Sequence, residues 1–246
     1  MDDENIKNQP TDLTILLPTY NESSSIEKML DTIKTIIPTN ICTEVLVVDD
    51  DSPDGTSDTV NSYIKKSDGV IRFRIHTRKN KRGVASAIID GISVAQGKFV
   101  LVMDSDFAHP PQLIQSMYEK LVNNECEIVV GSRYIKGGKF DDWPIHRKFM
   151  SRLASILPKF LLGLNVNDPN SGFFVIKKDL IKNLSFEAIG EKALLEILVK
   201  TKGVKIKEIP YICKNRKEGD SKFNFLVINN YFKLLRILLG HNRKLS

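Results

Sequence analysis

The chain has 246 residues, of which 41% are hydrophobic and 27% charged, and its formal net charge is +6 at pH 7. This composition supports a sizeable core and speaks against wholesale disorder. The cysteines, Cys42, Cys126 and Cys213, are far apart and form no CxxC pair, which argues against a disulfide framework or a zinc site and favours a reducing, cytoplasmic setting.

Residues 1–11 are polar and acidic and lack the features of a signal peptide, so we expect a flexible N-terminal tail. No stretch approaches the roughly 20 apolar residues that cross a bilayer, and we expect a peripheral protein at the cytoplasmic face of a membrane. Basic residues gather at 133–159 and 214–244. No nucleic-acid-reading motif accompanies them, so they favour anionic lipid or phosphate as the partner, with a solvated surface as the alternative.

Apolar runs alternate with amphipathic stretches in the first half of the chain. They predict strands at 13–17, 45–48, 71–75, 99–103 and 127–131, and helices at 23–37, 83–95 and 113–122. Pro18 is expected to close the first strand, and the alternating run 71–75 is expected near a sheet edge. This order predicts an α/β fold with a mostly parallel sheet flanked by helices.

The second half is less regular. It predicts strands at 173–176 and 204–210, a helix at 192–200, and a basic amphipathic helix at 144–164 that Pro158 interrupts. We therefore expect a tail at 1–11, the α/β domain at 12–222, and an amphipathic C-terminal helix with a basic tail at 223–246. The amphipathic segments 144–164 and 223–239 are candidates to lie in a membrane interface or to pack on the domain.

Carboxylates follow two predicted strands at the sheet edge where such folds bind ligands. Asp104 and Asp106, one residue apart, suit Mg²⁺ or Mn²⁺ bridged to a diphosphate, because these cations prefer hard oxygen ligands and keep substrate phosphates beside one or two carboxylates. Asp50 is expected to accept hydrogen bonds from a nucleobase or ribose. A solvated turn is the alternative for residues 52–56.

Six motifs occur in order along the chain: Pro18-Thr19-Tyr20-Asn21-Glu22, Asp49-Asp50 with Ser52-Pro53-Asp54-Gly55-Thr56, Asp104-Ser105-Asp106 with His109-Pro110, Gly131-Ser132-Arg133-Tyr134, Ser171-Gly172-Phe173-Phe174, and Arg216 with Gly219-Asp220-Ser221-Lys222. Together they resemble the family 2 glycosyltransferases of GT-A (Rossmann-like) fold, specifically the dolichol-phosphate mannose synthases in the form that lacks C-terminal transmembrane helices.

The resemblance implies an inverting transfer of mannose from GDP-mannose to a polyprenyl (dolichyl) phosphate, giving dolichyl phosphate mannose, with Mg²⁺ or Mn²⁺ as cofactor. A UDP-sugar donor, glucose or an amino sugar, is the first alternative, because Asp50 pairs with guanine or uracil. A catalytically inactive nucleotide-sugar- or lipid-binding subunit is the second, because Ala108 stands where relatives often carry Gln or Ser. A membrane surface and a small membrane-anchor subunit are the further implied partners, and nucleic acid is not expected.

The resemblance also implies residue roles. The catalytic residues are Asp104, Asp106, Arg133 and Arg216, and the metal ligands are Asp104 and Asp106. The nucleotide sugar is assigned to Pro18, Tyr20, Glu22, Val48, Asp50, Asp104, Ser105, Asp106, Arg133, Arg216 and Lys222. The acceptor phosphate is assigned to Arg133, Arg147 and Ser151, since a fork of arginine donors suits a phosphate monoester. His109 is expected to be structural rather than a base.

Overall fold

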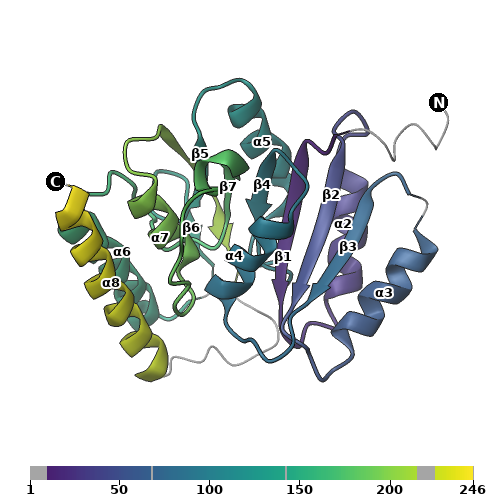
Figure 1. Ribbon diagram of the computed structural model, residues 1–246, viewed down its shortest axis with the longest axis horizontal. Coiled ribbons are helices and arrows are strands. Elements are labelled where there is room, and N and C mark those ends of the chain that lie inside the picture. The colour runs from purple at the N-terminus through teal and green to yellow at the C-terminus, as the bar shows by residue number, and fades with distance from the viewer. Residues whose placement is uncertain (1–9, 68, 142, 215–224, 246) are drawn as a thin grey trace.

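The computed structural model of the chain describes residues 10–67, 69–141, 143–214 and 225–245. In this part, one sheet of seven strands has the order β3-β2-β1-β4-β7-β5-β8 (Figure 1). Its strands are β1 (Leu13–Thr19), β2 (Thr43–Asp49), β3 (Arg72–Thr77), β4 (Phe99–Val102), β5 (Ile128–Ser132), β7 (Phe174–Lys177) and β8 (Ile206–Pro210). A two-stranded sheet pairs β6 (Lys139–Phe140) with β9 (Ile212–Cys213).

Most neighbouring strands run parallel. β3, β2, β1 and β4 are parallel to one another, as are β5 and β8, whereas β7 is antiparallel to β4 and β5. The predicted mostly parallel sheet is therefore confirmed. The edge position of the run 71–75 is also confirmed, because β3 is the outer strand of the described sheet.

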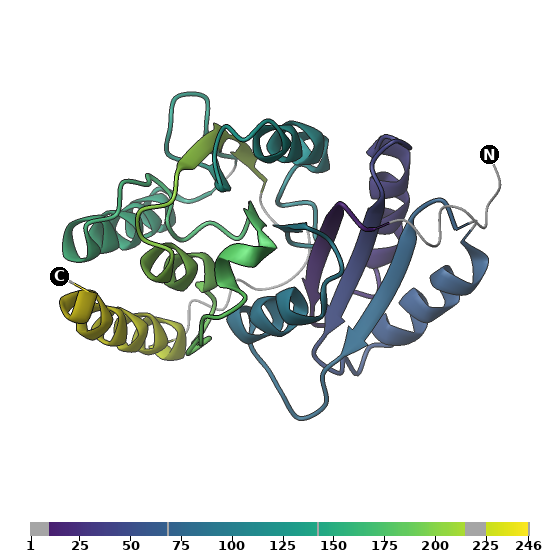
Figure 2. The same ribbon diagram turned by 45° about the horizontal axis from the view of Figure 1, so that its top comes forward.

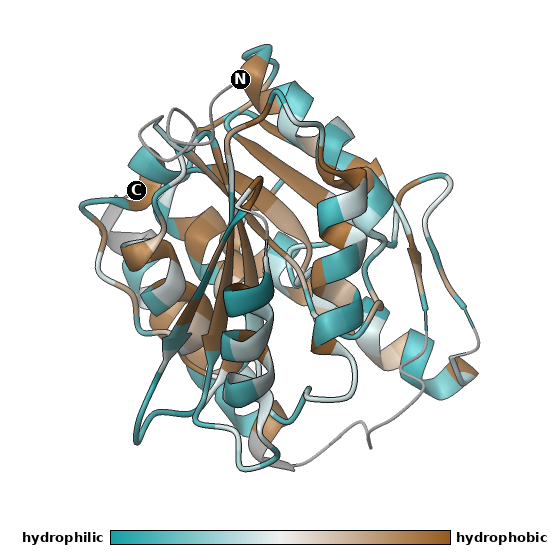
Figure 3. Cartoon of the chain, turned by 90° about the vertical axis from the view of Figure 1, so that its right-hand side faces the viewer, coloured by the Kyte–Doolittle hydropathy of each residue, from teal (hydrophilic) through white to brown (hydrophobic). Residues whose placement is uncertain are grey.

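Helices cover both faces of the sheet. They are α2 (Ile26–Ile36), α3 (Thr56–Lys66), α4 (Val84–Val94), α5 (Ile114–Val122), α6 (Ile145–Leu162), α7 (Ala193–Lys200) and α8 (Phe225–Leu245), with 3-10 turns η1 (Pro111–Leu113) and η2 (Lys178–Ile181). Successive strand residues point to opposite faces, so the apolar strands seen in Figure 3 supply two cores. Leu16 faces the core under α4, α6, α7 and α8, and Leu17 faces the core under α2, α3 and α5.

Pro18 does not close β1, contrary to the prediction. It pairs with Val48 of β2, beyond the point where the pairing of β1 with β4 ends at Leu16, so its missing N–H leaves no gap in the ladder. The sequence patterns also gave no separate prediction for α3. That helix is mostly polar and buries only Thr56 and Val60, which leaves little apolar periodicity to detect.

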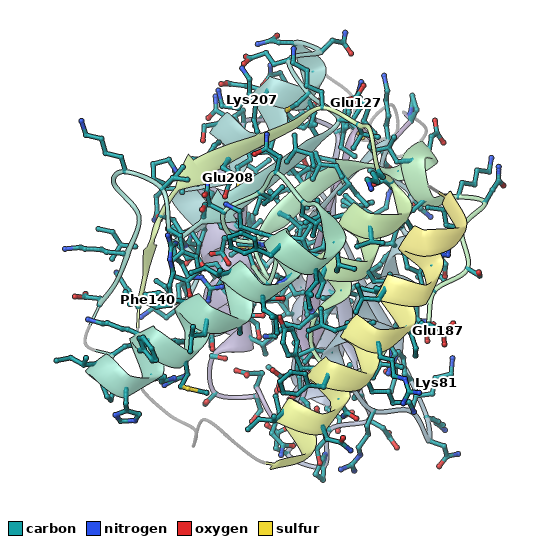
Figure 4. All side chains as sticks on the ribbon, turned by 90° about the vertical axis from the view of Figure 1, so that its left-hand side faces the viewer. Lys81, Glu127, Phe140, Glu187, Lys207 and Glu208 are labelled. Atoms are coloured by element: carbon teal, nitrogen blue, oxygen red, sulfur yellow. The ribbon has the colours of Figure 1, made fainter. Side chains whose placement is uncertain are left out.

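The predicted interruption at Pro158 is wrong, because α6 runs through it. Proline has no N–H and leaves the carbonyl four residues earlier without its helical donor. That carbonyl, of Ala154, accepts instead from the side-chain amide of Asn170 (2.8 Å) and from the hydroxyl of Tyr231. The replacement bonds tie α6 to the segment before β7 and to α8, which lies beside it (Figure 4).

α8 confirms the predicted C-terminal helix. Leu234, Leu235 and Leu238 are buried against the domain, and Figures 1 and 2 place α8 and α6 at the opposite end of the molecule from α3. No helix of the described residues is long and apolar enough to span a bilayer. The domain limits 1–11, 12–222 and 223–246 stay predictions, and residues 1–9, 223, 224 and 246 lie outside the described residues.

Candidate active site

The loops after β1, β2, β3 and β4 share an unusual backbone feature. Each holds a non-glycine residue with positive φ: Asn21 (61°), Asp51 (54°), Asn80 (57°) and Phe107 (61°). Asparagine and aspartate tolerate this region, whereas holding Phe107 there costs about 1–3 kcal/mol. Strain of this kind gathers at ligand sites. The carboxyl edge of the parallel strands therefore has both the topology and the backbone of a binding site.

Asp104 and Asp106 lie in a loop that closes on itself directly after β4. The N–H of Asp104 donates to Nδ1 of His109 (3.0 Å), and the N–H of Ala108 donates to Oδ1 of Asp106 (2.9 Å). The Asp104 side chain is 30% exposed, whereas Ser105 between the two aspartates is buried. The loop thus presents carboxylate oxygen to solvent from a fixed backbone.

His109 packs beneath this loop, between the loop and the core. Its buried ring stacks on Phe173 at 5.2 Å between centroids and meets the edge of Tyr211 at 5.5 Å. Because Nδ1 accepts a hydrogen bond, the proton of the neutral ring lies on Nε2, and Nδ1 is already engaged with Asp104. This geometry supports the structural role that we expected for His109.

The loop also fits a divalent cation only in part. The described residues contain no group of three His, Cys, Asp or Glu side chains that could hold a metal ion. Mg²⁺ and Mn²⁺ commonly take one or two carboxylates together with substrate phosphates and water. Asp104 and Asp106 match that donor set if a diphosphate completes it. Ala108 has no ligating side chain and contributes its N–H to Asp106.

The two aspartates at the carboxyl end of β2, Asp49 within the strand and Asp50 just after it, have different partners. Asp49 is fully buried, and its carboxylate accepts from hydroxyls of the surrounding loops, those of Thr19, Ser52 and Ser57. Asp50 accepts from the N–H of Gly83 (2.8 Å), and its Oδ1 lies 2.9 Å from Nε of Arg78. Burial raises the pKa of Asp50 above its ordinary value, and Gly83 and Arg78 oppose that rise. Asp49 therefore connects the loops around it through hydrogen bonds, whereas Asp50 is held at the candidate site by Gly83 and Arg78.

Arg78 is a residue of the candidate site that the sequence analysis missed. It follows β3 directly and is 3% exposed, and it also donates to the hydroxyl of Ser86 (2.9 Å). Its position in the sequence could have identified it. Arg78 follows the strand predicted at 71–75, and Asp50 follows the strand predicted at 45–48, so the two side chains are expected to meet if these strands are neighbours. Arg78 holds Asp50 in place and offsets its charge.

The other residues implied for the nucleotide sugar are divided between surface and core. The ring of Tyr20 is 37% exposed, and the guanidinium of Arg82 lies 4.7 Å from its centroid. Glu22 accepts from the hydroxyl of Ser25 (2.7 Å). Pro18 pairs with Val48, whose side chain belongs to the core. Tyr20 is thus the member of this group that offers an exposed ring to a base.

Arg133 follows β5 directly and forms a buried ion pair with Asp168. Its backbone N–H and its Nε donate to Oδ2 at 3.0 and 2.7 Å, and its Nη2 donates to Oδ1 at 2.8 Å. Burial lowers the pKa of Arg133, but the Asp168 carboxylate more than offsets this and holds the pKa well above its ordinary value. Asp168 was not among the predicted residues, although it lies three residues before the Ser171-Gly172 motif.

Aromatic side chains connect the residues implied for the acceptor phosphate. The centroid of the Tyr134 ring lies 5.6 Å from the guanidinium of Arg133, and the Tyr134 hydroxyl donates a hydrogen bond to Oγ of Ser151 (2.6 Å). The guanidinium of Arg147 lies 3.6 Å from the ring centroid of Trp143. Arg133, Ser151 and Arg147 are thus linked through Tyr134, Phe140 and Trp143.

Tyr211 joins the acidic and the cationic parts of the site. Its ring contacts His109 and Phe173, and the charges of Arg133 and Asp104 both act on its hydroxyl. Chiefly because it is buried, its pKa is well above the ordinary value. Asp104 and Arg133 therefore lie near one buried tyrosine. Two further residues of the predicted site, Arg216 and Lys222, lie outside the described residues.

Comparison with known proteins identifies the chain's relatives. Residues 14–185 match the family model described as Glycosyl transferase family 2. A dolichol-phosphate mannosyltransferase of Pyrococcus furiosus is 34% identical over 223 residues, which are 90% of this chain and 62% of that protein, so the chain spans less than two thirds of its length. A protein of the same name from Saccharomyces cerevisiae is 31% identical over 92% of this chain and 86% of its own.

Solved structures share the fold at lower identity. Glucosyl-3-phosphoglycerate synthase from Mycobacterium tuberculosis, solved with Mn²⁺, UDP and phosphoglyceric acid, matches with a TM-score of 0.69 at 18% identity, covering 97% of this chain and 81% of that one.

An undecaprenyl-phosphate mannosyltransferase of Micrococcus luteus is a further relative in sequence, 32% identical over 85% of this chain and 86% of its own.

Proposed function

The chain belongs to glycosyl transferase family 2 and has the GT-A fold, and on that basis we propose that it transfers mannose from GDP-mannose to a polyprenyl phosphate. Relatives named for mannosyl transfer to dolichol phosphate and undecaprenyl phosphate match most of the chain. The proposal takes Mg²⁺ or Mn²⁺ as cofactor and a membrane surface as partner. The solved neighbours bind Mn²⁺ and UDP-glucose, but at 18% identity they support the fold rather than the donor.

The observation that carries the proposal is the meeting of two kinds of charge. Asp104 and Asp106 follow β4, and Arg133 follows β5. His109 lies 3.8 Å from the Asp104 carboxylate and contacts Tyr211, and the charges of Asp104 and Arg133 both act on that tyrosine. A carboxylate pair suits a cation and the donor diphosphate, whereas arginines suit a phosphate acceptor. Transfer to a phosphate brings the anionic donor diphosphate and the anionic acceptor together. This site would neutralise the first with the cation at the carboxylates and the second with the arginines.

The acceptor needs no general base. A phosphate monoester loses its second proton near pH 6, so its oxygen is already a nucleophile at pH 7. The phosphate oxygen forms a bond to the anomeric carbon, and the bond from that carbon to the diphosphate oxygen breaks with inversion. The electron pair leaves with the nucleoside diphosphate, and no proton has to move. A buried His109 whose Nδ1 is occupied fits this scheme.

The side chains of the site divide the work of placing and neutralising charge. Arg133, fixed by Asp168, and Arg147, stacked on Trp143, are preorganised for the acceptor phosphate. Asp104 and Asp106 would hold the cation, which when bound offsets the charge that builds on the leaving diphosphate. Because no side chain has to act as a general base, activity depends on how these residues place the two substrates.

The outward face of α6 is the surface that would meet the membrane. Its apolar stripe is strongly exposed, with Ile145 at 85%, Phe149 at 62% and Phe160 at 84%, while the buried side chains, among them Ser155 and Leu162, lie on the opposite face. A helix on the surface of a soluble domain normally turns polar side chains outward. On α6 the outward face is apolar instead, as expected for a helix that contacts a membrane.

Charge on α6 matches an anionic lipid surface. The helix has no acidic residue, and its cations are Arg147, Lys148, Arg152 and Lys159. Exposed apolar side chains with basic flanks are typical of helices that lie in the headgroup region. Since Arg147 and Ser151 are on this same helix, docking of α6 on the bilayer would bring the proposed acceptor residues close to the lipid phosphates.

Labelled-donor assays test the proposed reaction. Purified protein with Mn²⁺ and a polyprenyl phosphate is given GDP-mannose, UDP-glucose or a UDP-amino sugar, each labelled in the sugar. We expect label in the lipid from GDP-mannose and none when Asp104→Asn replaces the wild type. Label from UDP-sugars alone would overturn the donor, and a lipid without label in every arm would overturn the reaction.

A further inference from the structure

Buried hydrogen bonds hold Arg133 in one orientation. The Asp168 carboxylate accepts three of them from this one residue, from the backbone N–H, Nε and Nη2. Asp168 has no exposed surface, and the Arg133 side chain is 12% exposed. Where water is excluded, a charge-assisted and bidentate pair of this kind is strong and directional. The guanidinium is therefore fixed before any substrate arrives.

Asp168 is itself held by a neighbouring strand. Its N–H donates to Oε1 of Glu208 (3.1 Å), and Asn167 donates to Oε2 from its backbone and its side-chain amide, at 2.9 and 2.8 Å. Glu208, labelled in Figure 4, lies on β8 opposite Val130 of β5, the strand that ends just before Arg133. Both partners of the ion pair are thus anchored to paired strands.

We infer that Asp168 is a positioning residue, which aims the Arg133 guanidinium at the acceptor phosphate. Asp168 occupies the edge formed by Nε and Nη2, so the edge formed by Nη1 and the second N–H of Nη2 is the one turned to a ligand. The inference rests on the proposed function, in which Arg133 binds that phosphate. While the acceptor is absent, the Asp168 carboxylate neutralises the buried Arg133 guanidinium. This pairing lowers the free-energy penalty of keeping a buried positive charge in the site.

A double-mutant cycle tests whether Asp168 acts through Arg133. Its members are the wild type, Asp168→Asn, Arg133→Ala and the double variant. Asp168→Asn should lower kcat/KM for the polyprenyl phosphate by about 10- to 100-fold, the loss usual when an outer partner of a functional group is removed. In the Arg133→Ala background the same change should cost less than about threefold, because the group that it positions is gone. Additive losses would overturn the inference.

Binding gives a second readout that does not depend on turnover. The cycle is repeated on the Kd of a short, water-soluble prenyl phosphate by calorimetry, and the same non-additivity is expected. The Kd of GDP with Mn²⁺ should weaken clearly less than the Kd of the prenyl phosphate in Asp168→Asn, because the inference aims the Arg133 guanidinium at the acceptor phosphate. Glu125→Gln, which alters a surface ion pair with Lys207, is the matched control and should change neither constant.

Two outcomes separate the inference from the proposed function. A wild type that binds and glycosylates the prenyl phosphate, with additive losses in the cycle, refutes only the positioning role. A wild type that does neither refutes both. If Asp168→Asn melts below the assay temperature, Glu208→Gln replaces it, because that change weakens the support of Asp168 one step further from the site. Its smaller loss should also vanish in the Arg133→Ala background, and its persistence there would count against the inference.

Discussion

Replacing Phe149 and Phe160 of α6 by serine should weaken membrane binding strongly. Burying a phenylalanine side chain contributes about 1.5–3 kcal/mol. Scaled by exposures of 62% and 84%, the two rings contribute about 3 kcal/mol together. That corresponds to a loss of about 150-fold in the partition coefficient, since 1.4 kcal/mol is about tenfold.

Vesicle flotation measures this loss. Wild-type protein should float with vesicles that contain phosphatidylserine, bind zwitterionic vesicles less well, and lose part of its binding in high salt, because the cations of α6 contribute. Val122→Ser on α5 is the matched control, since Val122 is an exposed apolar side chain outside α6. Neither change should alter the free energy of unfolding by more than about 0.5 kcal/mol. Unchanged flotation of Phe149→Ser/Phe160→Ser, or equal loss in the control, would refute membrane docking by α6.

Three further predictions concern the site. Asp104→Asn and Asp106→Asn should each reduce sugar transfer at least about 100-fold in a labelled-donor assay with the circular dichroism unchanged, and full activity of both would refute the metal role. Arg147→Ala should raise KM for the lipid acceptor about tenfold and leave the Kd of the donor nucleotide unchanged, whereas equal losses would contradict the acceptor assignment. Finally, burial holds the pKa of Tyr211 well above 10. The unfolded chain then releases this proton first, so stability should fall as pH rises above about 10, and Tyr211→Phe should flatten that fall in urea titrations; an unchanged slope would contradict it.

Sequence patterns predicted the sheet well because burial on both faces makes parallel strands nearly continuous apolar runs. The same logic predicted where the site lies, since residues that follow parallel strands meet at one edge. Asp104, Asp106 and Arg133 were predicted in this way or by resemblance, and in the structure the charges of all three act on the buried thiol of Cys213. Arg216 and Lys222 remain predictions of the same kind.

Long-range partners were beyond these patterns. Asp168 lies 35 residues from Arg133, and no local spacing identifies such a pair. The helix through Pro158 was missed for a related reason, because a local rule treats proline as a break. The carbonyl of Ala154 finds donors in Asn170 and in Tyr231, 77 residues along the chain, and only the fold brings them together. Tertiary contacts here overrule the local preference.

Phosphorus NMR of the lipid tests the central claim that the acceptor phosphate is the nucleophile. With GDP-mannose and Mg²⁺, the polyprenyl phosphate resonance should change from that of a monoester to that of a diester, with one GDP released for each diester formed. Asp104→Asn should leave the monoester signal in place. Consumption of the donor by the wild type while the lipid phosphate stays a monoester would contradict the claim.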